Sequence, residues 1–188
     1  MTSDCDLMVM VRAGDEQAFD VLVERYRARL QAFAYRLCCD REEAADLAQE
    51  ILVRLWLGRA AYAPQTKFTT YLYTIAYNCC IDCSRRRRAR PRTTPLEEQI
   101  GPAARLALQR MLSRSDVPDE VLLQRYEMHR IRSAVLRLAQ EHRVVFILAH
   151  FEDLRYAQIA EILSIPVGTV KSRMHYAVMR LRELLESR

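Results

Sequence analysis

Three cysteines lie directly against a run of arginines in the segment NCCIDCSRRRRAR, residues 78–90. Cys80 and Cys83 have the CxxC spacing of many metal and thiol sites, whereas the arginines after them would hold the phosphates of a nucleic acid. The two interpretations predict different proteins. Residues elsewhere in the chain decide between them.

The cysteines do not form a complete metal motif. A structural zinc ion needs four ligands, and the sequence has no second CxxC and no HxxxH motif. Cys38 and Cys39 would complete a site only if the fold brought them close to Cys80 and Cys83. We therefore expect no metal and no cofactor, and a cysteine-based zinc or redox sensor is the alternative from a different functional class. No nucleophile–base pair and no paired carboxylates stand out, so the sequence does not predict an enzyme.

Aromatic side chains precede the arginines in the segment FTTYLYTIAYN, residues 68–78. At helical spacing Phe68, Leu72, Ile75 and Cys79 share one stripe, which we expect to be core, and Cys79 is then a small buried hydrophobe. Rings that stack on bases, followed by cations that hold phosphates, are what single-stranded nucleic acid requires. For any single tyrosine a core position is an equally good interpretation. The candidate DNA-binding residues of this segment are Phe68, Tyr71, Tyr73, Tyr77, Asn78, Arg85, Arg86, Arg87 and Arg88.

A helix-turn-helix pattern follows in residues 156–185, where YAQIAEIL precedes the turn SIPVG. The turn contains a glycine, and we expect the second helix to begin at Thr169 as its N-cap. Its apolar stripe, which should pack on its own domain, consists of Val170, Met174, Ala177, Leu181 and Leu184. The opposite face carries small polar and basic groups that suit a major groove. The candidate DNA-binding residues here are Thr169, Lys171, Ser172, Arg173, His175 and Tyr176.

A third candidate surface lies on the expected helix DREEAADLAQEILVRLWLGRA, residues 40–60. One side has a broad apolar stripe, while the other side sets apolar residues among carboxylates. Such a mixed face indicates a protein-binding surface, although another helix of the same domain would cover it equally well. The candidate protein-binding residues are Asp46, Gln49, Glu50, Val53 and Leu57.

Composition points to an all-α protein, with 51% hydrophobic residues, 28% charged residues and only four glycines among 188 residues. The net charge of +5 is concentrated in residues 64–94, which carry seven basic residues and one acidic residue. No apolar stretch approaches the roughly 18 residues of a membrane span, and the N-terminal segment lacks the features of a signal peptide. We therefore expect a cytoplasmic protein without membrane insertion. Its six cysteines, expected to stay reduced, are Cys5, Cys38, Cys39, Cys79, Cys80 and Cys83.

Breaker residues divide the chain into two small helical domains joined by a loosely structured linker. Pro91, Pro95, Gly101 and Pro102 mark that linker. We expect domains at residues 1–90 and 119–188 with the linker at 91–118. Asp15 and Asp40 are placed to cap helices. The expected helices cover residues 4–13, 15–38, 41–61, 66–88, 103–113, 119–139, 141–151, 156–163 and 169–186.

Taken in order, DLAQEILVRLW, FTTYLYTIAYNCCID with its arginines, a linker and YAQIAEILSIPVGTVKSRMH resemble a bacterial sigma factor of the extracytoplasmic function (ECF) group. This group is the minimal two-domain branch of the sigma-70 family. The resemblance implies a factor that binds core RNA polymerase and directs it to promoters. A helix-turn-helix regulator that acts without polymerase is the alternative within DNA binding, but it would leave the aromatic–arginine segment without a role.

The resemblance also assigns roles to the three surfaces. Asp46, Gln49 and Glu50 would contact the clamp helices of the largest polymerase subunit. Residues 68–88 would recognise and melt the single-stranded −10 element, and the helix from Thr169 would recognise the duplex −35 element. An anti-sigma factor is the expected regulatory partner. Tyr71 stands where relatives often have Trp, so we expect an altered melting wedge. Tyr176 stands where relatives often have Arg, so the −35 preference is not copied from relatives.

Overall fold

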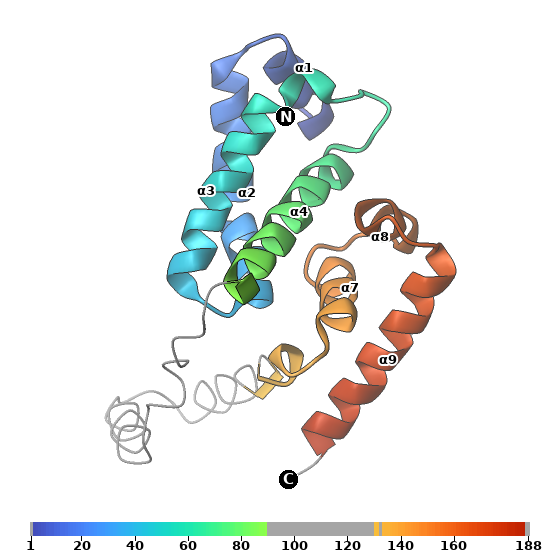
Figure 1. The fold of residues 1–188 in the computed structure, drawn as a ribbon. Coiled ribbons are helices and arrows are strands. Elements are labelled where there is room, and N and C mark those ends of the chain that lie inside the picture. Colours follow the sequence, from blue (N-terminus) through green and yellow to red (C-terminus); the bar gives the residue numbers. More distant parts are fainter. Residues whose placement is uncertain (1, 90–129, 132, 187–188) are drawn as a thin grey trace, which may run out of the picture.

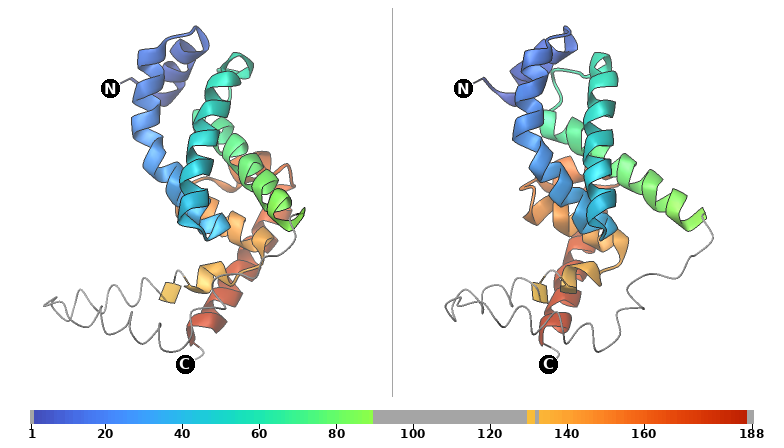
Figure 2. Two further views of the ribbon diagram at one scale, coloured as in Figure 1. Left: turned by 60° about the vertical axis from the view of Figure 1, so that its left-hand side comes forward. Right: turned by 90° about the vertical axis from the view of Figure 1, so that its left-hand side faces the viewer.

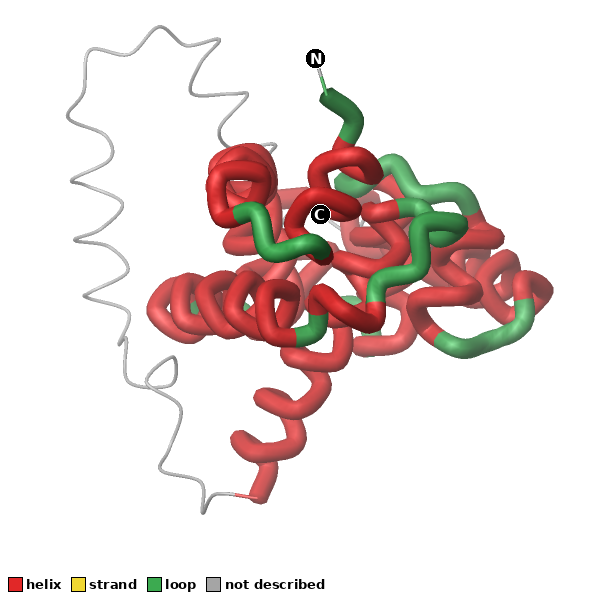
Figure 3. Tube along the Cα trace, turned by 90° about the horizontal axis from the view of Figure 1, so that it is seen from above, coloured by secondary structure: helices red, strands yellow, loops and turns green. Residues whose placement is uncertain are grey.

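The computed structural model describes residues 2–89, 130–131 and 133–186, and its regular elements are all helical (Figures 1 and 3). The N-terminal helices are α1 (Asp4–Arg12), α2 (Glu16–Cys38), α3 (Arg41–Leu57), the 3-10 helix η1 (Arg59–Ala61) and α4 (Phe68–Ala89). The C-terminal helices are α7 (Gln140–His150), α8 (Tyr156–Leu163) and α9 (Val167–Glu186). The all-α prediction is confirmed. None of these helices combines the length and apolar character that a membrane span requires.

The expected helix boundaries agree closely with these elements where the structure describes them. Residues 130–131 and 133–136 are helical, within the expected helix 119–139. The rest of that helix up to residue 129, the expected helix 103–113 and the expected linker 91–118 lie outside the described residues.

Two aspartates start helices as the sequence predicts. The Asp15 carboxylate accepts the backbone N–H of Ala18 at 3.0 Å at the start of α2. Asp40 accepts the N–H groups of Glu42 and Glu43 at 2.9 and 3.0 Å at the start of α3. Each cap satisfies donors that have no partner within the helix, which fixes where the helix begins.

The turn between α8 and α9 differs from the sequence-based prediction. Ser164, not glycine, takes the left-handed conformation that ends α8, with φ 52°. α9 begins at Val167, and the Pro166 carbonyl accepts the N–H groups of Thr169 and Val170. Thr169 is therefore inside the helix and is not its N-cap. The expected helix-turn-helix is present with a shorter turn.

The N-terminal helices bury a common apolar core. α2 packs along α3, and α4 crosses both. Two edge-on ring pairs join α2 to α4, Tyr26 with Phe68 and Phe33 with Tyr73, each with ring centroids 5.2 Å apart. Aromatic pairs in this geometry add to the stabilisation from burial. The largest fully buried aliphatic side chains of this core include Leu22, Leu30, Ile51, Leu55 and Leu72.

The C-terminal helices pack against the N-terminal helices. α7 packs on α9 and α8, while α8 also lies against α4 and α7 against α2. Both views of Figure 2 show the orange and red helices adjoining the blue and green ones. The buried apolar side chains of the two groups form one continuous cluster. We call this packing of α8 on α4 and of α7 on α2 the closed arrangement.

Leu22→Ala tests the core assignment. Leu22 has no exposed surface, so truncation should lower the free energy of unfolding by about 2–5 kcal/mol through lost burial and a residual cavity. Val21→Ala, at the exposed neighbouring position, should change it by less than about 0.5 kcal/mol. Urea denaturation of the three proteins measures both values. Equal losses in the two variants would show that this face of α2 is not core.

Candidate nucleic-acid interface

α4 carries the whole aromatic–arginine set on one helix of 22 residues. Phe68 and Tyr73 are buried at 2% and 0% exposure. Phe68 lies in the core of the N-terminal helices, against Tyr26. Tyr73 packs on Phe33 and is covered on its other side by the C-terminal helices. In the closed arrangement neither ring has a surface on which a base could stack.

Tyr71 joins the start of α4 to the end of α3. Its hydroxyl donates to the Gly58 carbonyl at 2.8 Å, and its ring lies 5.2 Å from that of Tyr62. A Cβ on residue 58 would come within 3.2 Å of the Tyr71 hydroxyl and 3.0 Å of the Arg54 carbonyl, so glycine permits this close approach. Burial raises the pKa of Tyr71. Tyr71 is half-buried, which leaves part of the ring accessible.

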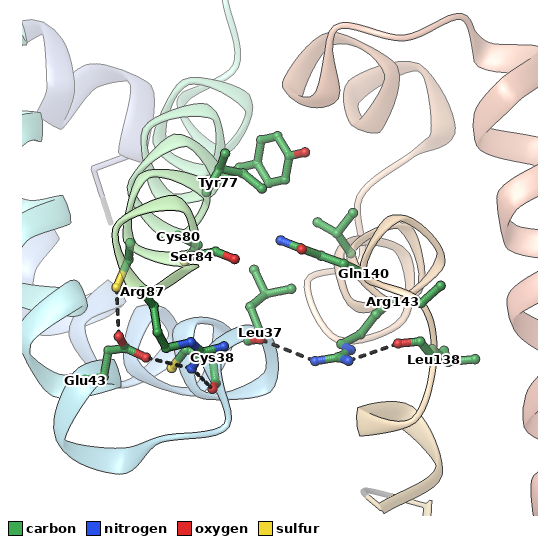
Figure 4. A pocket seen from close by; sticks show the side chains of 14 residues that line it. Leu37, Cys38, Glu43, Tyr77, Cys80, Ser84, Arg87, Leu138, Gln140 and Arg143 are labelled. Atoms are coloured by element: carbon green, nitrogen blue, oxygen red, sulfur yellow. Dashed lines mark hydrogen bonds and ion pairs between the residues drawn. The ribbon is translucent and has the colours of Figure 1, made fainter. Parts of the chain in front are cut away.

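The middle of α4 presents Tyr77 and Asn78 in different settings. Tyr77 is half-buried and lines a cavity of about 350 Å³ between α4 and α7 (Figure 4). Asn78 is exposed to solvent. Of the polar and aromatic candidates in residues 68–78, Asn78 is thus the most accessible in the closed arrangement.

The arginines of α4 contact α3. Arg86 lies 3.4 Å from a Glu50 carboxylate oxygen. Arg87 lies 3.4 Å from Glu43 and donates to the Cys38 carbonyl at 3.2 Å. Arg85 is exposed, and the Arg88 side chain lies outside the described residues. The candidate protein-binding surface on α3 therefore touches the candidate DNA-binding set on α4 at the Glu50–Arg86 pair.

The apolar part of the α3 surface is open to solvent. Val53 is 56% exposed and Leu57 is 71% exposed. Asp46 and Gln49 are exposed beside them, and Glu50 pairs with Arg54 one turn along the helix at 2.5 Å. No helix in the described part of the chain covers Val53 or Leu57, so the alternative that a neighbouring helix buries them is wrong for these residues.

The outer face of α9 is also open. Lys171, Ser172, His175 and Tyr176 are exposed, and Thr169 is half-buried. Arg173 is half-buried and pairs with Glu141 of α7 at 3.2 Å. The expected apolar stripe faces inward: Val170, Ala177 and Leu181 are buried, and Met174 and Leu184 pack against the core.

The cysteines near α4 are held as neutral thiols. Cys79 and Cys80 are buried, and the Cys83 thiol donates to Glu43 at 2.9 Å. Burial raises the pKa of Cys38, Cys79 and Cys83 to about 11 each, and burial raises the pKa of Cys80 still further. Metal ligation and nucleophilic attack both need the thiolate. Among the described residues, no three His, Cys, Asp or Glu side chains are arranged to hold a metal ion.

One cluster was not predicted from the sequence. Glu152, in the turn between α7 and α8, is only 5% exposed. Its carboxylate accepts a short hydrogen bond from the Tyr73 hydroxyl and lies 3.2 Å from Arg29 and 3.8 Å from Arg36. Burial raises the pKa of Glu152, while Tyr73 and the two arginines act in the opposite direction. We call this cluster of Glu152 with Arg29, Arg36 and Tyr73 the Glu152 contact.

Further polar contacts join the same helices. The Gln158 amide of α8 donates to Thr70 at 3.3 Å and to Thr69 at 3.5 Å. Arg143 of α7 donates to the Leu37 carbonyl at the end of α2 at 3.3 Å (Figure 4). The closed arrangement is therefore held by directional contacts at three places as well as by apolar packing.

Comparisons with known proteins match these two helical groups. Residues 22–90 match the family "Sigma-70 region 2", and residues 128–181 match "Sigma-70, region 4". The ECF RNA polymerase sigma factor SigW of Bacillus subtilis is 31% identical over 175 residues, which cover 93% of this chain and 92% of the relative.

Two solved structures share the fold. CnrH, solved in complex with the cytosolic domain of CnrY, superposes with a TM-score of 0.71 at 22% identity and covers 99% of each chain. The sigma factor RpoE, solved with the anti-sigma factor NepR from Bartonella quintana, gives a TM-score of 0.65 at 22% identity, covering 90% of this chain and 97% of the other.

Thiol alkylation tests the sensor alternative. At pH 8 iodoacetamide should modify the exposed Cys39 quickly, whereas Cys79 and Cys80 should react only in denaturant because their thiols are buried and neutral. Peptide mass spectrometry before and after addition of urea measures the difference. Rapid labelling of Cys80 in the folded protein, or stoichiometric zinc after purification without chelator, would restore the sensor interpretation.

Proposed function

Because the chain belongs to the ECF group of the sigma-70 family and as such directs RNA polymerase to promoters, we propose that three of its surfaces divide this work. The α3 surface binds core RNA polymerase, α4 recognises and opens the −10 element, and α9 recognises the −35 element. The chain is an initiation factor and not an enzyme. The observation that carries this function is the presence of both sigma-70 regions in order on one chain, because a lone helix-turn-helix regulator would not need residues 22–90.

The same proposal includes domain limits and location. Region 2 corresponds to residues 1–90 and region 4 to residues 119–188, with a linker at 91–118, and the family matches at 22–90 and 128–181 support these limits. A factor that works on RNA polymerase and promoter DNA acts in the cytoplasm. No metal or cofactor enters this function.

Core binding fits the α3 surface because its apolar residues are exposed among carboxylates. Val53 and Leu57 supply the apolar centre, and Asp46, Gln49 and Glu50 supply the polar margin. Interfaces draw most of their affinity from a few desolvated apolar side chains and use charge for orientation. A basic, partly apolar helix pair such as the polymerase clamp helices is a suitable partner.

Replacing the apolar centre tests the polymerase-binding role. The wild-type chain should co-elute with bacterial core polymerase, and the double variant Val53→Ser/Leu57→Ser should bind on the order of 100-fold more weakly, through loss of two contact residues. Val9→Ser/Val21→Ser removes exposed apolar residues from α1 and α2 and should bind like the wild type. Unchanged binding by the α3 variant would contradict the assignment of this surface to polymerase. A wild-type chain that does not bind core polymerase would contradict the proposed function.

The −10 role belongs to the exposed part of α4 together with the tyrosines that are covered in the closed arrangement. Asn78 and Arg85 are exposed, while Tyr73 and Tyr77 face the C-terminal helices. Base stacking on these tyrosines and phosphate contacts by the arginines would favour the single-stranded form and so promote opening. Phe68 and Tyr71 support the helix from its first turns, Phe68 within the core and Tyr71 against Gly58.

The −35 role belongs to the outer face of α9, where Lys171 and Arg173 would contact phosphates and Ser172, His175 and Tyr176 would face base edges. Lys171→Ala should weaken holoenzyme binding to all promoter sequences and reduce the salt-dependence slope by about 1. His175→Ala should instead relax preference at one position, at a cost of about 1–3 kcal/mol.

Binding of the holoenzyme to a randomised −35 library at several salt concentrations measures both effects. Arg182→Ala, which removes the same charge farther along the exposed face of α9, is the matched control and should change neither quantity. An identical base preference in the His175→Ala variant and the wild type would contradict the assignment of His175 to a base contact.

An anti-sigma factor is the proposed regulatory partner. The structurally similar RpoE was solved in complex with one. The exposed apolar residues of α3 and α9 offer surfaces that such a partner could cover.

A further inference from the structure

The Glu152 contact joins the two sigma-70 regions through a buried charge. The carboxylate comes from the region 4 turn, and its partners Arg29, Arg36 and Tyr73 all belong to region 2. The neighbouring Phe151 ring lies under the Arg36 guanidinium, 4.0 Å from ring centroid to carbon. Region 4 thus inserts one aromatic and one acidic side chain into a basic site on region 2.

A carboxylate in this position is stable only while both regions are in place. Taking the charge out of water costs several kcal/mol by general estimate, and nearby cations and hydrogen bonds must offset that cost. Here the offset comes from two arginines and a tyrosine hydroxyl, and none of them lies in region 4. The contact is therefore specific to one relative placement of the regions, because separating them would leave a buried charge without its partners.

The contact covers part of the proposed DNA-binding surface. Tyr73, which donates to Glu152, is fully buried, and Thr70, which accepts from Gln158 of α8, is 4% exposed. Tyr77 lines the cavity against α7. Single-stranded DNA cannot reach this side of α4 until α7 and α8 move away.

The proposed polymerase-binding and −35 surfaces stay exposed in the closed arrangement. Val53 and Leu57 of α3 are exposed, as are the base-contact candidates of α9, which lies on the other side of α7 from α4 (Figure 1). A partner can therefore bind α3 while the closed arrangement is intact. The order in which surfaces become available follows from this geometry.

We propose that the Glu152 contact holds the free sigma factor in the closed arrangement, masks the Tyr73 side of α4 from single-stranded DNA, and is broken only after core polymerase has bound at α3. The proposal rests on the function given above. The proposal has a quantitative consequence. The apparent DNA affinity of the free chain equals the affinity of the open molecules multiplied by the fraction of molecules that are open. Weakening the contact raises that fraction without altering any residue assigned to DNA.

Charge reversal at Glu152 tests the proposal. Glu152→Lys places a cation against two arginines and should open the chain, which small-angle X-ray scattering would record as a larger radius of gyration. Binding of a fluorescein-labelled, mixed-sequence single-stranded DNA, followed by anisotropy, should tighten on the order of 10-fold, equivalent to about 1.4 kcal/mol. Glu152→Gln, which keeps the shape and loses the charge, should give a smaller change in both quantities.

Glu161→Lys and Glu161→Gln are the matched controls. Glu161 is exposed on α8 of the same region, and its two substitutions change the net charge by the same amounts as those at Glu152. These controls therefore report the non-specific electrostatic gain in DNA binding. They should leave the radius of gyration unchanged, and any DNA-binding gain in the Glu152 variants counts only above theirs.

A second test leaves the sequence of region 4 unchanged, so it does not depend on whether a region 4 variant folds. Arg29→Glu, at a half-exposed position of α2, should open the chain from the other side. Combining it with Glu152→Lys restores an opposite-charge pair and should return the scattering profile toward the wild type.

Wild-type scattering from both Glu152→Lys and Arg29→Glu would overturn the proposal. So would an opened chain with DNA binding no tighter than that of the Glu161 controls. In either case co-elution of the wild type with core polymerase would still stand, so the two failures are distinguishable.

Discussion

The closed arrangement rests on a shared apolar core and polar contacts at three places, and of these the Glu152 contact is the one that buries a charge. Glu152 bridges α2 and α4 through Arg29, Arg36 and Tyr73, and these partners are separated from it by as many as 123 residues along the chain. Apolar burial supplies most of the stability of such a protein, but a buried ion pair defines a single placement of its partners. In the proposal above, the Glu152 contact selects one relative position of the two sigma-70 regions on top of their shared core.

This placement relates the three working surfaces to one another. α4 lies between the exposed α3 surface and region 4, with Glu50–Arg86 on one side and Tyr73–Glu152 on the other. A partner that competes for Glu50 at α3 therefore acts on a helix whose other side is held by region 4. The proposed polymerase-binding surface on α3 and the proposed −10 surface on α4 thus meet at the Glu50–Arg86 pair.

The sequence predicts the individual helices well because helix caps and apolar stripes depend on residues only a few positions apart. Asp15 and Asp40 cap helices as predicted, and the apolar stripes of α4 and α9 identify buried positions such as Leu72 and Ala177. The second helix of the helix-turn-helix is predicted to start at Thr169 but starts at Val167, because Ser164 and not the glycine of the turn takes the left-handed conformation. For Tyr73 the sequence leaves a core position and a DNA contact as equally good interpretations, since helical spacing cannot show that a second group of helices lies over it.

The Glu152 contact had no signal in the sequence. A single glutamate after Phe151 belongs to no periodic pattern and no motif. Its contacts are with Tyr73 and Arg29, which are 79 and 123 positions away along the chain. The same holds for Gln158 with Thr70 and Arg143 with Leu37. Contacts between regions depend on tertiary placement, which pattern and propensity do not specify.

Hydrogen–deuterium exchange of the whole chain, free and bound to core polymerase, tests the central claim most directly. In the free chain the backbone amides of α8 and of the turn containing Glu152 should be protected together with the α4 segment around Tyr73. On assembly with polymerase the turn should lose its protection while α3 gains it. Equal protection of the turn in both states, or an unprotected turn in the free chain, would contradict a closed free form that opens on polymerase.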